Sequence, residues 1–142
     1  MKKILLSLCL MLGICSLTLI STSAQDYYYE EKIEVVEEVM TRATSTKTAK
    51  KTASYKNSNG ATLWSVTVTG TFTYNGSTST CTKSEVSTKV NDSRWKISSS
   101  SSSKSGNTAS ANATAKCYSL GIVISTTTKT VTLTCDKNGN LS

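Results

Sequence analysis

The 142-residue chain contains no histidine and no proline, and only 18% of its residues are charged. Without histidine, the sequence excludes a Ser-His-Asp triad, a Cys-His nucleophile pair and every histidine-ligated metal site. Without proline it also excludes a sortase anchoring motif of the LPxTG kind, because that motif contains proline. The length suits one modest domain. Composition alone therefore removes several chemistries before any motif is considered.

Residues 1–24 have the pattern of a secretory signal peptide. Lys2 and Lys3 precede an apolar stretch from Ile4 to Ile20, and small residues follow up to Ala24. A basic region, an apolar region and small residues, in this order, predict cleavage after Ala24. The apolar stretch is short for a transmembrane helix, and no basic flank follows it. We therefore expect a secreted, extracellular protein with no membrane span in its mature chain.

Charge divides the mature chain into an acidic leader and a basic remainder. Residues 25–40 hold six acidic residues against one lysine, whereas residues 41–142 hold 13 Lys or Arg against three acidic residues. The leader can be a propeptide, a flexible tail, or a short helix or strand docked on the domain. Its apolar residues have helical spacing, but so short a helix is marginal alone. We favour a tail or loosely docked helix, and assign residues 25–60 to this acidic segment and a basic Thr/Lys-rich linker.

From residue 61 to residue 142 the sequence has the two-residue alternation of β-strands. Apolar or aromatic residues alternate with Ser and Thr in residues 63–74, and the alternation returns in residues 108–118 and 122–135. Asn75-Gly76 predicts a two-residue hairpin turn. Six to eight short strands separated by regular turns indicate an all-β, immunoglobulin-like two-sheet sandwich. A small β-barrel is the alternative.

Three cysteines remain after removal of the signal peptide: Cys81, Cys117 and Cys135. An oxidising compartment favours one disulfide and one free thiol. If residues 108–118 pair with residues 122–135 about the turn between them, Cys117 and Cys135 lie at opposite ends of the ladder, beyond disulfide reach. That leaves Cys81–Cys135 or Cys81–Cys117. We favour Cys81–Cys135, with Cys117 as a small buried hydrophobic residue.

The predicted β-domain offers no group of side chains suited to catalysis. Its carboxylates are Glu85, Asp92 and Asp136, and the two aspartates stand in turn sequences, where Asp caps its own backbone. We identify no catalytic residue, no metal site and no cofactor-binding motif. The sequence therefore indicates a protein that is not an enzyme.

Lysines are dispersed over several predicted strands, and Lys83, Lys89, Lys96 and Lys129 are the candidate surface-binding residues. Their field can attract a cell-wall polymer, a glycan or another anionic surface. Nucleic acid is not an expected partner for an exported chain. The alternative needs no partner, because lysines also keep a surface soluble and protect strand edges. We expect a monomer or a weakly associating chain.

Five segments of the β-domain form a recognisable set: Leu63–Val68, Phe72–Gly76, Cys81, Trp95–Ile97 and Val131–Cys135. In these segments the chain resembles a group of small secreted β-rich proteins of Gram-positive gut bacteria with no assigned activity. The resemblance covers about residues 45–142 and leaves out the acidic leader. It implies export and a β-domain, and it carries over no active site.

Together these features predict an extracellular binding or adhesion module for an anionic or carbohydrate surface. The charge division between residues 25–40 and 41–142 motivates an alternative, a secreted antagonistic peptide or toxin with an acidic prosegment.

Overall fold

The structure is a computed structural model that describes residues 26–142, and the described part of the chain is all β-strand and connecting loops. The predicted signal peptide, residues 1–24, and its cleavage site lie outside the described residues. The strands are β1 (Tyr28–Val39), β2 (Ser45–Lys56), β3 (Thr62–Tyr74), β4 (Ser79–Val90), β5 (Trp95–Ser105), β6 (Thr108–Ser119) and β7 (Ile122–Thr134).

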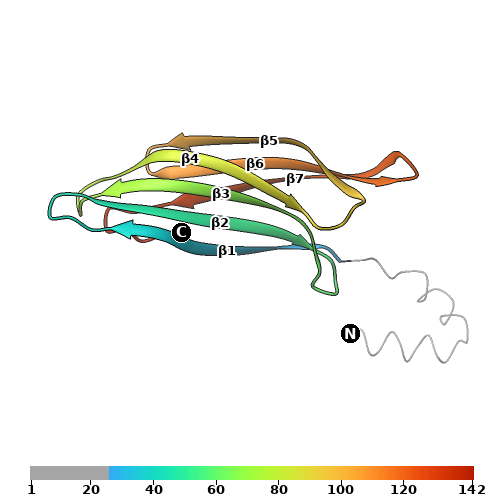
Figure 1. Ribbon diagram of the computed structural model, residues 1–142, viewed down its shortest axis with the longest axis horizontal. Helices are drawn as coiled ribbons and strands as arrows, with labels where there is room; N and C mark the ends of the chain where they lie inside the picture. Colours follow the sequence, from blue (N-terminus) through green and yellow to red (C-terminus); the bar gives the residue numbers. More distant parts are fainter. Residues whose placement is uncertain (1–25) are drawn as a thin grey trace, which may run out of the picture.

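The strands form two antiparallel sheets that pack face to face (Figure 1). Sheet A has the order β1-β2-β3-β4, and sheet B has the order β5-β6-β7. This confirms the predicted two-sheet sandwich. Every ladder joins strands that follow each other in the sequence, so both sheets are up-and-down meanders. The likeness to an immunoglobulin domain therefore lies in the two packed sheets, since immunoglobulin domains use Greek-key connections.

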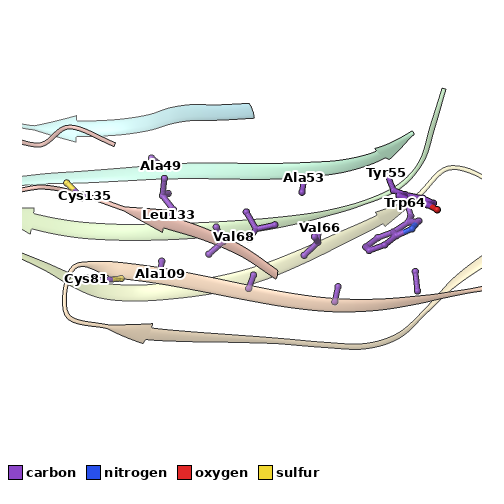
Figure 2. Packing of buried hydrophobic residues seen from close by; sticks show 14 of the residues in the cluster. Ala49, Ala53, Tyr55, Trp64, Val66, Val68, Cys81, Ala109, Leu133 and Cys135 are labelled. Carbon is purple, nitrogen blue, oxygen red and sulfur yellow. The ribbon is translucent and has the colours of Figure 1, made fainter. Parts of the chain in front are cut away.

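Sheet A supplies most of the large core side chains. The alternation of β3 turns Trp64, Val66, Val68 and Phe72 inward, where each is fully buried. Opposite them, β6 contributes four buried alanines, Ala109, Ala111, Ala113 and Ala115. Figure 2 shows Ala109 on the side of the core facing β3. Small residues let the sheets approach closely, and a Cβ added at Gly70 would lie only 2.9 Å from the Cβ of Ala109.

Residues 25–60 differ from the expectation of an acidic tail or helix followed by a linker. They form β1 and β2, so the sandwich includes residues from Tyr28 onward, and the expected domain boundary at residue 61 is wrong. The reason is charge complementarity between two antiparallel strands. Glu38 lies opposite Lys47 and forms an ion pair with it, and Glu31 pairs with Lys51. Cross-strand pairs of opposite charge stabilise a sheet, and here they replace the apolar alternation that normally marks a strand.

The predicted two-residue turn at Asn75-Gly76 is also wrong. Tyr74 pairs with Ser79, so four residues form the loop, and Gly76 has a positive φ of 84° whereas Asn75 does not. The side-chain oxygen of Asn75 instead accepts hydrogen bonds from the backbone N–H groups of Ser77 and Thr78. Asparagine thus stabilises a longer loop through its side chain rather than through a left-handed backbone.

The contacts between the two sheets differ at the two long edges of the sandwich. On one side β4 lies beside β5, and the Ser102 hydroxyl donates a hydrogen bond to the Ser84 carbonyl over 3.2 Å. On the other side β7 packs under β2 and β3, so β1 extends beyond the edge of sheet B. Lys129 of β7 spans this side, where its ammonium group lies 2.8 Å from the carboxylate of Glu31.

Candidate functional site

The four candidate lysines occupy different surfaces. Lys83 and Lys89 lie on the outer face of sheet A, opposite Thr71 and Ser65 of β3. Lys96 lies on the outer face of sheet B. The side chain of Lys129 points toward β1, where it pairs with Glu31 and lies 4.9 Å from the centre of the Tyr29 ring. The structure therefore does not bring the four lysines together.

Ion pairs join β1 to β2 through three of the five glutamates of β1. The ammonium of Lys47 lies 3.0 Å from Glu38, that of Lys51 lies 3.3 Å from Glu31, and Lys56 pairs with Glu30. Hydrogen bonding to Lys129, together with the contact to Lys51, lowers the pKa of Glu31 below its usual range. The acidic leader is thus a strand in which three of six carboxylates pair with lysines of neighbouring strands.

Sheet B carries no acidic residue. Asp92 and Asp136 bracket the sequence of its strands, and between them the chain contains only basic and uncharged side chains. Its lysines are Lys96, Lys104, Lys116 and Lys129. The strands of sheet B therefore carry four lysines and no carboxylate, whereas in the strands of sheet A seven lysines are nearly balanced by six glutamates.

Hydroxyl groups cover the outer face of sheet B. Thr108 bonds to Thr134 across 3.0 Å, Thr114 bonds to Thr128 across 2.9 Å, and the Asn112 amide donates to Thr130 over 2.7 Å. These pairs join β6 to β7 in a regular row, with the serine-rich strand β5 beside them. The result is an extended polar face rather than a hollow.

Two lysines meet at one end of this face. Lys96 of β5 lies directly opposite Lys116 of β6, and the ammonium of Lys96 lies 5.3 Å from the centre of the Tyr118 ring. Like charges placed opposite each other on neighbouring strands destabilise a sheet. Because sheet B holds no carboxylate, no acidic partner in the sheet offsets this repulsion. The sequence prediction missed this lysine pair, since Lys116 was not among the candidate surface-binding residues.

The carboxylates of the β-domain have structural roles. Asp92 accepts a hydrogen bond from the backbone N–H of Arg94 over 2.9 Å and pairs with its guanidinium over 2.8 Å, which lowers the pKa of Asp92. Asp136 accepts hydrogen bonds from Asn138 and Asn140, and its pKa is lowered as well. Glu85 pairs with Lys83 over 3.0 Å. These contacts are those of turn caps and surface ion pairs.

Cys81, Cys117 and Cys135 are buried free thiols. Cys81 and Cys135 lie at the same end of the core (Figure 2), where their backbone N–H groups donate to the carbonyls of Gly106 and Asn107. Burial raises the pKa of both thiols, which keeps them protonated and unreactive toward electrophiles at neutral pH. The favoured pairing of Cys81 with Cys135 stays a prediction.

No protein-family model matches the chain, and no curated protein or solved structure is similar to it. Among the described residues there is no helix with the length and apolarity that crossing a bilayer requires. The geometry of the two sheets therefore carries the functional argument.

Proposed function

We propose that this chain is a secreted, non-enzymatic β-sandwich that binds an anionic or carbohydrate surface outside the cell through the outer face of sheet B. The observation that carries the proposal is the position of Lys96 directly opposite Lys116 on a sheet without carboxylates. This arrangement costs the isolated fold stability, because the two ammonium groups repel each other. A phosphate, sulfate or carboxylate group of a polymer, bound between them, would remove that repulsion.

The hydroxyl rows beside the lysine pair support the same function. Threonine and serine hydroxyls donate and accept hydrogen bonds, so they suit both sugar hydroxyls and phosphate oxygens. The face extends along β5, β6 and β7, as a polymer chain would require. Cell-wall polymers and anionic glycans combine these two kinds of group, and they are the partners that the proposal names.

Retention on heparin beads and on isolated Gram-positive cell walls tests this proposal. The Lys96→Gln/Lys116→Gln variant is compared with a matched variant, Lys83→Gln/Lys89→Gln, which removes the same charge from sheet A. Near an anionic surface each lysine contributes about 1 kcal/mol, so loss of the sheet B pair is expected to weaken binding about 30-fold. The matched variant retains most of the affinity, and added salt releases the wild-type protein.

Two results would overturn the proposal. One is a wild-type protein that passes through both matrices at low salt. The other is an equal loss of affinity in the two variants, since binding would then follow net charge rather than the face of sheet B.

A second candidate function is that of a secreted antagonistic peptide or toxin with an acidic prosegment. It is motivated by the charge division between residues 25–40 and 41–142. In that case the mature chain would begin after the acidic segment. The pairing of β1 with β2 along its whole length favours retention of the segment, because its removal would uncover the edge of β2. Intact mass of the exported protein decides between the two: a chain beginning at Gln25 removes the prosegment argument, and one beginning beyond Met40 supports it.

A further inference from the structure

The β6–β7 hairpin ends in an apolar tip. Leu120 is 99% exposed, and Ile122 and Ile124 are 68% and 61% exposed. The ladder between β5 and β6 ends where Trp95 meets Cys117, so residues 118–124 continue beyond β5 as a two-stranded finger. Figure 1 shows this finger projecting past the other loops at its end of the sandwich. The tip therefore adds nothing to the hydrophobic core.

The backbone of Leu120 is unfavourable for leucine. Leu120 has a φ of 51° and Gly121 has a φ of 77°, so both central residues of the turn are left-handed. Asn, Asp and Gly adopt this conformation at little cost, whereas other side chains clash with their own backbone. Neither burial nor turn geometry accounts for a leucine here. A residue that the fold does not favour, held in an uncommon conformation, points to a role in binding.

Behind the tip, aromatic and basic side chains follow in a defined order. Tyr118 lies opposite Val123, and the Lys96–Lys116 pair lies just behind the finger, with the Lys96 ammonium over the Tyr118 ring. From the tip inward the order is aliphatic, tyrosine, lysine. A lipid leaflet presents the matching order from its interior outward: acyl chains, an interface that favours tyrosine, and anionic headgroups that attract lysine.

We propose that residues 118–124 are a membrane anchor that enters the interfacial region of an anionic phospholipid leaflet. The proposal rests on the proposed function for its lysine pair, and it adds the aliphatic tip as a separate contact. A narrow convex finger needs no shaped partner to bury it in lipid, whereas a protein partner would have to offer a matching cavity. About three residues on each strand at about 3.4 Å per residue give a depth of about 10 Å, that of interfacial insertion.

The finger should not enter the hydrocarbon core of the bilayer. The finger has only two strands, so each of its outer edges carries backbone groups without a ladder partner. In the hydrocarbon core these groups would lack hydrogen bonds, at a cost that the small tip cannot offset. The anchor therefore holds the sandwich against a leaflet without spanning it.

Sedimentation with vesicles tests the anchor. The probes are vesicles of phosphatidylcholine alone and vesicles of phosphatidylcholine mixed with phosphatidylglycerol. Wild-type protein should sediment with the mixed vesicles. Leu120→Asn should weaken partitioning about tenfold, and Leu120→Asn/Ile122→Asn should weaken it further, because each change removes apolar surface that the lipid buries. The matched control Val36→Asn/Val39→Asn removes exposed aliphatic residues of β1 and should bind as the wild type does.

Thermal unfolding distinguishes loss of the anchor from loss of the fold. Because asparagine tolerates the left-handed turn, Leu120→Asn should raise the thermal midpoint by about 2–5 °C while it weakens vesicle binding. Its retention on heparin beads should not change, so failure of the anchor and failure of the proposed function give different results.

Three results would overturn the anchor. The first is a wild-type protein that is retained on heparin but does not sediment with mixed vesicles. The second is a Leu120→Asn variant that binds vesicles as strongly as the wild type. The third is a dimer in sedimentation velocity that Leu120→Asn dissociates without changing vesicle binding, because the tip would then be a contact between two copies of the chain.

Discussion

The strands of sheet A carry seven lysines and six glutamates, and the strands of sheet B carry four lysines and no carboxylate. In sheet A the opposite charges join β1 to β2, so they help to hold the sheet together. In sheet B the lysines have no acidic neighbour within the sheet, and two of them face each other. The comparison shows that lysines of sheet A pair with carboxylates of a neighbouring strand, whereas Lys96 and Lys116 of sheet B have no acidic partner within their sheet.

The two sheets also differ in what they give to the core. Sheet A contributes Trp64, Val66, Val68 and Phe72, whereas the central strand of sheet B contributes alanines. Large side chains of β3 and small ones of β6 fill the core between these two strands without overpacking it. Four predictions test this division of roles, beginning with the largest expected effect.

Truncation of a large side chain in β3 should cost far more stability than truncation of an alanine in β6. Phe72 is fully buried, and Phe72→Ala should lower the free energy of unfolding by about 3–5 kcal/mol. The matched change in sheet B, Ala111→Gly, should lower it by about 0.5–1 kcal/mol. Urea unfolding followed by Trp fluorescence measures both values. Similar losses in the two variants would contradict the division of the core.

A covalent link between the sheets is expected in an oxidising compartment. Cys81 belongs to β4, Cys135 follows β7, and a disulfide between them would stabilise the sandwich by about 4 kcal/mol in the chain-entropy model. Alkylation of the unfolded, unreduced protein should then add one group, on Cys117, and alkylation after reduction should add three. Three groups without reduction would show that the disulfide does not form.

Adding one methyl group at Gly70, where the two sheets approach closely, should destabilise the protein. A Cβ at Gly70 would lie 2.6 Å from the Phe72 ring and 2.9 Å from the Cβ of Ala109. Gly70→Ala should therefore destabilise the protein by about 1–3 kcal/mol. Ala109→Gly removes one of the two clashes, so the double variant should recover part of the loss. If the stability losses of the two single variants simply add in the double variant, the strain lies within β3 alone.

Acid should weaken the contacts of β1 with its neighbours by a small amount. Lys129 and Lys51 lower the pKa of Glu31 below the ordinary value of about 4.3, so its ionised form stabilises the fold above that pH. The contribution is lost as the pH falls through the lowered pKa. Because the side chain is partly exposed, Glu31→Gln should cost at most about 1 kcal/mol at pH 7 and nothing at pH 2.

Urea unfolding at both pH values measures the effect of Glu31→Gln. Glu34→Gln is the control, since Glu34 makes no side-chain ion pair within residues 26–142. An equal pH dependence in Glu31→Gln and the wild type would contradict the role of this carboxylate.

Strands with an apolar inward face could be predicted from the sequence. The alternation in residues 63–74 and 108–118 corresponds to β3 and β6, because their inward positions hold aliphatic, aromatic or alanine side chains. In β2 the inward positions include Lys47 and Lys51, whose ammonium groups reach carboxylates of β1. Because lysines occupy inward positions, β2 lacks the usual alternation of apolar and polar residues. The sign of this strand pair in the sequence is a Glu-rich segment followed by a Lys-rich segment that can pair with it in antiparallel register.

The candidate interface was only partly predictable for a related reason. The absence of acidic residues between Asp92 and Asp136 can be read directly from the sequence. The position of Lys96 opposite Lys116 depends on the register of β5 with β6, which contains a shift between Ile97 and Ser99. A bulge of this kind decides which side chains meet, and composition does not encode it.

The meander connectivity has a consequence for the order of assembly. Each hairpin closes over a loop of two to five residues, so the strands within a sheet meet at little cost in chain entropy. The contacts of β2 with β7 join nearly opposite ends of the described chain, and they must form late. A chain emerging N-terminus first can complete sheet A while Trp64 still faces solvent. Burial of the Trp64 indole would then report the step at which sheet B packs against sheet A.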